Sequence, residues 1–152
     1  MKTIRSQSSK MRAAGATVLA TATLVTGLPG VSFAGPAEPG EFTTKVIIKN
    51  HTDLLMTLIH SQVTYGEWTS SPPEEISADG VGRMETASTD EEGGTGGTVT
   101  YLTSEGSVTV YWNDPDTRTD NEFTCDAPST LTCTATGSPR GRKPVANIDI
   151  YD

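Results

Sequence analysis

The sequence is short of the residues on which most enzymes depend. It has two histidines and two cysteines, and aromatic residues occupy 6% of its 152 positions. It contains no nucleophile elbow, no zinc-binding His-Glu-x-x-His helix and no cysteine–histidine signature, so neither nucleophilic nor zinc catalysis has a recognisable footing. The histidines, His51 and His60, stand outside any motif. We therefore expect a protein that is not an enzyme and that needs no cofactor.

Basic residues are also scarce. The chain has 11 Lys and Arg against 19 Asp and Glu, and four of the basic residues lie within the first twelve positions. Proteins that bind nucleic acid or anionic headgroups by charge alone need clustered Lys and Arg. The sequence therefore excludes nucleic acid as a partner, and any affinity for a membrane must be apolar or headgroup-specific. The small basic cluster Arg140, Arg142 and Lys143 is interpreted as a solvated turn.

No hydrophobic run is long enough to span a bilayer. The charge-free stretch Ala13–Leu28 has 16 residues, fewer than the roughly 20 that a transmembrane helix needs. It follows a basic segment and precedes Ser32-Phe33-Ala34, whose small residues suit signal peptidase. The sequence thus predicts a signal peptide over 1–34, cleavage near Ala34, and a secreted extracellular protein.

The 118 residues after this cut suit one domain with one core. Residues 35–41, rich in Gly and Pro, predict a flexible leader, and residues 42–152 predict the folded domain. Short runs of Val, Ile, Thr, Tyr and Trp recur there between clusters of Gly, Pro, Asn, Asp and Ser. This texture predicts an all-β fold, a single antiparallel β-sandwich of about eight strands.

Several strands can be placed. Phe42–Lys49 and Leu54–Thr64 flank a turn cluster and are expected to pair as a hairpin, and Val81–Ser88 is a shorter strand after a break at Ser70–Pro73. The acidic, glycine-rich stretch Thr89–Gly97 predicts an exposed loop. The remaining strands are expected at Thr98–Leu102, Ser107–Trp112, Asn121–Cys125, Thr130–Thr136 and Val145–Tyr151, with the second hairpin closing through Ser104-Glu105-Gly106.

Cys125 and Cys133 are the only cysteines. In a small secreted domain such a pair most often bonds to itself. We predict a disulfide that ties neighbouring strands near their turn and contributes about 2.5 kcal/mol by closing a short loop.

Two clusters could carry binding. Asp114, Asp116 and Asp120 lie close together in the chain and form a weak calcium candidate, but their spacing is not that of an EF-hand, so a solvated acidic loop is favoured and no metal is expected. Tyr and Trp beside loops suit either a core or a site for a lipid headgroup or sugar, because they combine an apolar face with a polar edge. Trp68, Trp112 and Tyr101 are the candidate ligand contacts.

Short motifs in a fixed order resemble the aegerolysins and related small crystal proteins of bacilli and actinobacteria. The resemblance spans about 44–123 and rests on these motifs: Lys49-Asn50-His51-Thr52, Tyr65-Gly66-Glu67-Trp68, Pro72-Pro73-x-x-Ile76, Gly94-Thr95-Gly96-Gly97-Thr98-Val99-Thr100-Tyr101 and Trp112-Asn113-Asp114-Pro115. Trp68 and Trp112 match family tryptophans. The chain departs from the family pattern at Gly96, where Glu is usual, at Asp116, where an aromatic is usual, and at Thr119-Asp120-Asn121, which replaces a Gly-Ser-Asn turn.

The resemblance implies a β-sandwich of the aegerolysin or actinoporin kind. It also implies binding to membrane lipids, often sphingolipid with sterol, and recruitment of a larger pore-forming partner protein. The sequence-based hypothesis is therefore a secreted, non-catalytic lipid-binding protein, toxin-like or haemolysin-like. Two alternatives stay open: a lectin-like module that stacks the same aromatics on sugar rings, and an inhibitor or structural protein acting through a protein interface.

Overall fold

The computed structural model describes residues 41–89, 93–115 and 119–152. The predicted signal peptide and nearly all of the predicted leader lie outside these ranges. Ten strands form within them: β1 (Thr43–Asn50), β2 (Met56–Tyr65), β3 (Glu67–Ser70), β4 (Glu75–Ile76), β5 (Val81–Ala87), β6 (Thr95–Thr103), β7 (Gly106–Asp114), β8 (Glu122–Asp126), β9 (Thr132–Gly137) and β10 (Val145–Tyr151). The described ranges contain no helix, and hence none long and apolar enough to cross a membrane.

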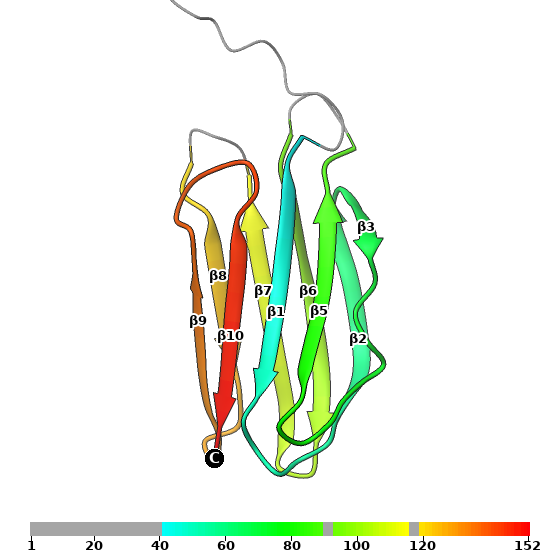
Figure 1. Ribbon diagram of the computed structural model, residues 1–152, viewed down its shortest axis with the longest axis vertical. Coiled ribbons are helices and arrows are strands. Elements are labelled where there is room, and N and C mark those ends of the chain that lie inside the picture. Colours follow the sequence, from blue (N-terminus) through cyan, green and yellow to red (C-terminus); the bar gives the residue numbers. More distant parts are fainter. Residues whose placement is uncertain (1–40, 90–92, 116–118) are drawn as a thin grey trace, which may run out of the picture. The chain divides into compact units, whose positions relative to one another are not determined.

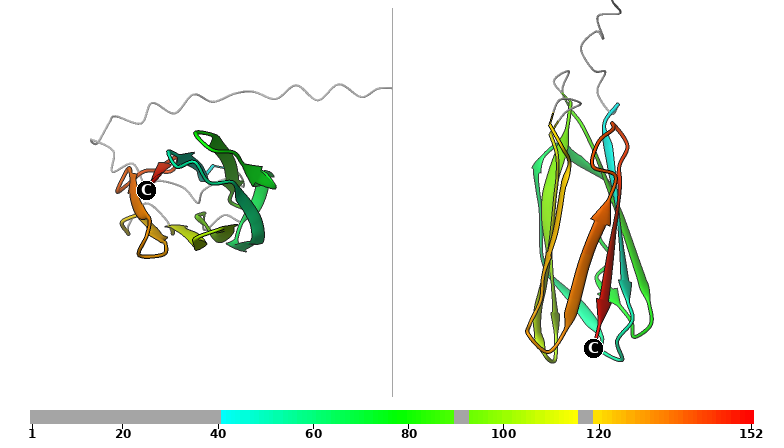
Figure 2. Two further views of the ribbon diagram at one scale, coloured as in Figure 1. Left: turned by 90° about the horizontal axis from the view of Figure 1, so that it is seen from below. Right: turned by 90° about the vertical axis from the view of Figure 1, so that its left-hand side faces the viewer.

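The strands form two sheets of five. The first sheet has the order β3-β5-β1-β10-β9, and the second sheet has the order β4-β2-β6-β7-β8. The sheets face one another as two layers (Figures 1 and 2). The predicted β-sandwich is therefore confirmed, with ten strands in place of about eight.

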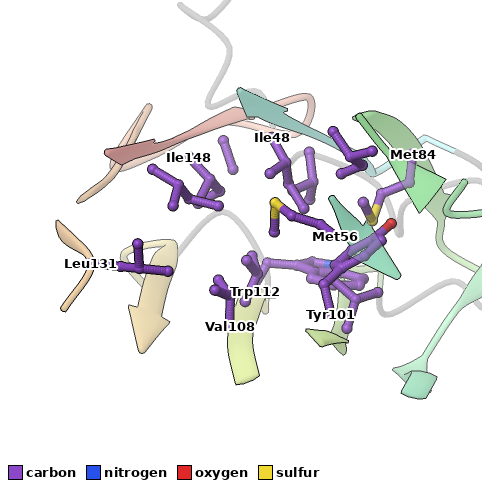
Figure 3. Packing of buried hydrophobic residues seen from close by; sticks show 14 residues of the cluster. Ile48, Met56, Met84, Tyr101, Val108, Trp112, Leu131 and Ile148 are labelled. Carbon is purple, nitrogen blue, oxygen red and sulfur yellow. The ribbon is translucent and has the colours of Figure 1, made fainter. Parts of the chain in front are cut away.

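The core lies between the two layers and follows the alternation of each strand. Val46 and Ile48 of β1 point inward from the first sheet, whereas Val108, Val110 and Trp112 of β7 point inward from the second, and all five are at most 1% exposed. Figure 3 shows Ile48 and Ile148 facing Met56, Val108 and Trp112 across this interior. Side chains at every second strand position share one face, so the sequence pattern alone identifies most of these core positions.

The β6–β7 hairpin is the element that the sequence predicted best. Its ladder runs from Thr95 opposite Asp114 to Thr103 opposite Gly106. The connecting turn is where the sequence placed it. The first strand of the hairpin is longer than predicted, because β6 begins at Thr95. It includes Gly96 and Gly97, which are buried and not part of the predicted exposed loop. Residues 90–92 of the predicted loop lie outside the described residues.

The predicted hairpin between the first two long strands is wrong. β1 pairs with β5 and β10 in the first sheet, whereas β2 pairs with β4 and β6 in the second. The buried side chain of Asn50 organises the corner between them. Its Nδ2 donates to the carbonyls of Leu54 (2.7 Å) and Ser77 (2.9 Å), and its Oδ1 accepts from the hydroxyl of Thr52 (2.7 Å). These bonds satisfy the buried amide of Asn50 at the point where the chain crosses from the first sheet to the second.

The sheets are not entirely antiparallel. β1 and β10 lie side by side in parallel, with Val46 opposite Ala146 and Ile48 opposite Ile148. Strand runs with turn signals show where strands occur but not which strands become neighbours, so this parallel pair was not predicted. β3 and β4 were also missed because they are four and two residues long and lie on either side of a proline pair.

The disulfide between Cys125 and Cys133 is confirmed, with 5.9 Å between the Cα atoms. The two residues are near a turn, as predicted, but the strands they join are not paired with each other. β8 is an edge strand of the second sheet and β9 is an edge strand of the first. The bond therefore connects the two layers at one side of the sandwich.

Candidate functional site

Two of the three predicted contact residues lie in the core. Tyr101 and Trp112 are both 0% exposed, and Figure 3 shows them among the buried side chains. The Tyr101 hydroxyl donates to the carbonyl of Pro73 (2.9 Å), and burial raises the pKa of this tyrosine. The Trp112 indole donates to the hydroxyl of Thr86 (3.2 Å). Because neither residue has surface to offer a ligand, the prediction that they contact one is corrected here.

Trp68 is partly buried at the opposite side of the sandwich from the disulfide. It lies on the edge strand β3, opposite Thr86 of β5, and its ring centroid is 5.5 Å from that of Trp112, with the planes tilted by 55°. Trp68 thus packs against the core cluster with part of its ring. Because part of the indole is exposed, Trp68 remains a candidate contact, although core packing covers the rest of the side chain.

The three aspartates of the calcium candidate are not brought together in the part of the chain that can be examined. Asp114 is 0% exposed and accepts from the hydroxyl of Thr44 (3.3 Å), whereas Asp120 is exposed and pairs with Arg140. Asp116 lies outside the described residues. No group of three or more His, Cys, Asp or Glu able to hold a metal ion occurs within the described ranges.

The two histidines lie in different parts of the fold, His51 directly after β1 and His60 within β2. The His51 Nε2 is 2.9 Å from the Asp149 carboxylate, and the imidazole stacks on Tyr151 at 4.5 Å between ring centroids. The hydrogen bond from His51 lowers the pKa of Asp149. Among the described residues no hydroxyl or thiol is hydrogen-bonded to His51, so this pair lacks the nucleophile of a catalytic triad.

The cationic loop is largely neutralised within the domain. Arg140 pairs with Asp120, and Arg142 pairs with Glu41 while lying 5.5 Å from the ring centroid of Phe42. The predicted solvated turn therefore also holds the start of β1 in place.

The outer faces of the two sheets differ in chemistry. The first sheet carries ion pairs between Lys45 and Glu85 and between Lys49 and Asp149. In the second sheet, β2, β6 and β7 contain no Lys, Arg or Glu, and their one aspartate, Asp114, is buried. We call the outward-facing side chains of these three strands the threonine face: Thr57, Ile59, His60, Gln62, Tyr65, Thr98, Thr100, Leu102, Ser107, Thr109, Tyr111 and Asn113.

Threonine hydroxyl groups lie in the middle of the threonine face. Thr100 and Thr109 are paired across β6 and β7, with 3.2 Å between their hydroxyl oxygens, and Thr98 lies opposite Tyr111. Among the described strands of the second sheet, exposed acidic side chains occur on the border strands, at Glu75 of β4 and at Glu122 and Asp126 of β8, and Glu105 lies in the β6–β7 turn. Such a surface offers hydrogen bonds and apolar contact without charge.

An aromatic group lies at one end of this face. The ring of Tyr65 rests over Gly96, where an added Cβ would be 2.7 Å from the tyrosine Cε1. Burial, and then the proximity of Tyr111 and Asp114, raises the pKa of Tyr65 to about 12. Its hydroxyl and the Oδ1 of Asn113 are both buried and have no hydrogen-bond partner among the described residues. Gly96, a departure from the family pattern, thus provides the space in which Tyr65 lies.

Sequence reasoning missed this cluster, although a signal was present. The predicted alternation of Val108, Val110 and Trp112 already placed Thr109 and Tyr111 on the opposite, outer face. Only the register of β2 against β6, which sets Tyr65 beside Gly96, shows that residues far apart in the sequence meet there.

The comparison with solved structures shows the fold. The crystal structure of the lipid binding protein Nakanori is similar to this chain with a TM-score of 0.61 at 11% sequence identity, covering 73% of this chain and 71% of that chain. No family model matches the sequence, and no curated protein matches it. At this identity the similarity establishes a shared β architecture.

Proposed function

We propose that this protein is a secreted, non-catalytic module that binds membrane lipid through the threonine face. The observation that carries the proposal is the contrast between the two outer faces: the first sheet is ionic, whereas β2, β6 and β7 present hydroxyl, amide, aromatic and aliphatic groups without fixed charge. Tyrosines and hydroxyls suit the headgroup region, where apolar and polar contacts are both needed. The likeness of fold to a lipid-binding protein and the resemblance to aegerolysins support the same function.

The charge of the domain indicates which lipids it prefers. Residues 35–152 hold seven Lys and Arg and 19 Asp and Glu, a balance of 7 − 19 = −12. An anionic bilayer would repel such a domain, since attraction to it requires basic residues near the surface. We therefore propose neutral or zwitterionic lipids as the target, with sphingolipid and sterol as the first composition to test.

Co-sedimentation with vesicles tests the proposal. The domain from Gly35 onward is mixed with vesicles of phosphatidylcholine, of sphingomyelin with cholesterol, or of phosphatidylserine. Two matched variants accompany it: Thr100→Glu, on the threonine face, and Thr134→Glu, on the outer face of the first sheet. Each threonine side chain makes one hydrogen bond, to Thr109 and to the Asp149 carbonyl respectively. Thermal unfolding establishes that both variants fold.

We expect binding to a zwitterionic composition that Thr100→Glu weakens by about tenfold, because a carboxylate must then be desolvated at the contact. Thr134→Glu should bind like the parent protein. Equal loss in both variants, or no binding to any vesicle, would refute the proposal.

A toxin-like or haemolysin-like action, with or without a larger pore-forming partner, is a further part of this proposed function. Release of a dye trapped in the vesicles that bind the domain tests it directly. Leakage caused by the domain alone supports independent membrane damage. Binding without leakage would instead favour a role as the lipid-recognising component of a two-protein system.

A lectin-like function is the second candidate, and one observation favours it. The Tyr65 hydroxyl and the Asn113 Oδ1 are buried and have no hydrogen-bond partner among the described residues, and Tyr65 lies near Tyr111. A shift of the two side chains toward the surface would offer a donor and an acceptor to the hydroxyls of a sugar ring. Binding of the domain to immobilised glycans in the absence of lipid, lost in Asn113→Ala, would support this alternative over the first.

A further inference from the structure

We infer that Leu55, Ile59 and Leu102 form an apolar anchor that enters the bilayer, so that the domain contacts a zwitterionic membrane with one defined end of the threonine face. This inference rests on the proposed lipid binding and deepens it. All three side chains are large and about half exposed, at 50%, 54% and 46%. Exposed aliphatic groups are common singly, but a cluster indicates an interaction site.

The strand register places the three side chains together. Thr57 of β2 lies directly opposite Leu102 of β6. Leu55 precedes Thr57 by two residues, in the segment just before β2, and Ile59 follows it by two. The alternation of the chain therefore places both on the exposed face that Thr57 shares with Leu102. β2 begins and β6 ends at the same end of the sandwich (Figure 1).

A break in strand regularity helps to expose the anchor. The register of β2 against β6 shifts between Leu58 and His60, which makes Ile59 the additional residue of a bulge. Leu58 is partly buried against the core. The bulge allows Ile59 to face solvent beside an inward-facing leucine, in keeping with the use of bulges to redirect a side chain.

The other exposed apolar residues do not form such a group. Val81 (45% exposed) lies opposite Lys49 on the outer face of the first sheet, and Val145 (37%) lies opposite Lys45. Tyr151 (43%) is stacked on His51. Each therefore has a cationic or titratable neighbour, whereas the residues directly opposite Leu102 on the two flanking strands are Thr57 and Ser107.

The surroundings of the anchor suit a zwitterionic lipid surface. The nearest charged residue across the sheet is Glu75 of β4, which is opposite Thr57 and marks the border of the patch. No Lys or Arg lies on β2, β4, β6 or β7. Exposed carboxylates also lie nearby in the chain, at Asp53 before Leu55 and at Glu105 after Leu102. An apolar cluster with hydroxyls and carboxylates at its border can penetrate between uncharged headgroups, but these strands offer no cation to attract an anionic surface.

A fluorescence experiment tests the inference. Leu102→Cys and Val81→Cys are labelled with an environment-sensitive dye after the Cys125–Cys133 bond has formed. Val81 is the matched control because it is an aliphatic residue of similar exposure on the other sheet. With sphingomyelin–cholesterol or phosphatidylcholine vesicles, the dye at position 102 should brighten and shift to the blue and be quenched by a lipid-borne quencher, while the dye at position 81 should not change.

Substitutions provide the second readout. Leu102→Glu should weaken co-sedimentation by about tenfold or more, since a charge is then placed in an apolar environment, and Val81→Glu should leave it unchanged. Both variants should keep the parent thermal stability because both side chains are exposed.

The outcomes separate the two proposals. Vesicle binding without a change at position 102 would overturn the anchor and leave lipid binding through the threonine face intact. No vesicle binding at all would overturn both. Self-association of the domain in analytical ultracentrifugation that Leu102→Glu abolishes, in the absence of any dye change with vesicles, would show that a second copy covers the patch, and it would also overturn the anchor.

Discussion

The rings of Trp68 and Trp112 are in contact across the interior of the sandwich, with their centroids 5.5 Å apart. Trp112 is fully buried on β7, whereas Trp68 comes from the short edge strand β3 in the opposite sheet. Trp68 therefore covers one side of the core, and the disulfide connects the layers at the other side. This contact makes stability the first expected role of Trp68.

Replacing Trp68 by alanine should lower the free energy of unfolding by about 2 to 3 kcal/mol, somewhat below the cost for a fully buried aromatic. Urea unfolding followed by circular dichroism measures this change, and Trp68→Phe should retain most of the stability. If Trp68→Ala instead keeps the parent stability but loses vesicle binding, then Trp68 is a lipid contact and not a packing residue.

The stability of the domain should fall at alkaline pH. The pKa of Tyr65 is about 12 in the folded state, against about 10 in an unfolded chain. The folded state therefore holds the phenolic proton where the unfolded state releases it, so this contribution is complete below pH 10 and is lost as pH rises toward 12. Urea unfolding at increasing pH should show this loss, and Tyr65→Phe should reduce the slope. An unchanged slope would contradict the assignment to Tyr65.

Gly96→Ala should displace the ring of Tyr65, because the new Cβ would lie 2.7 Å from the tyrosine Cε1. We expect a loss of about 1 kcal/mol, at the low end of the cost of overpacking because Tyr65 is only partly buried. The pKa of Tyr65 should fall toward its ordinary value as the ring becomes solvated, and tyrosinate absorbance would report this. In the Tyr65→Ala background the same glycine substitution should cost nothing, and a persistent cost would place the clash elsewhere.

Removal of the disulfide by Cys125→Ser together with Cys133→Ser should lower the free energy of unfolding by about 2.5 kcal/mol. Because the bond joins the edge strands of different sheets, its removal should increase local opening most strongly at that edge. Hydrogen exchange of amides in β8 and β9 should accelerate more than that in β1 and β5. Uniform acceleration throughout the domain would show that the bond acts only on global stability.

The candidate site could be predicted from the sequence only in part. The alternation of Val108, Val110 and Trp112 identified the buried side of β7 and, by difference, placed Thr109 and Tyr111 outside. The same pattern could not tell whether a buried aromatic serves the core or a ligand, and both Tyr101 and Trp112 belong to the core. Aromatic residues have the same sequence signature in either setting, since both settings favour large apolar rings.

The amino-acid sequence by itself determined the class of fold, the positions of the long strands, the β6–β7 turn and the cysteine pairing, because each depends on local alternation, turn chemistry or a single available partner. The tertiary structure decided which strands are neighbours. The Asn50 corner separates β1 from β2, β10 returns parallel to β1, and β6 brings Gly96 beneath Tyr65 and Leu102 beside Thr57. These relationships join distant segments through backbone pairing, which is the same for every side chain, so no local pattern in the sequence encodes them.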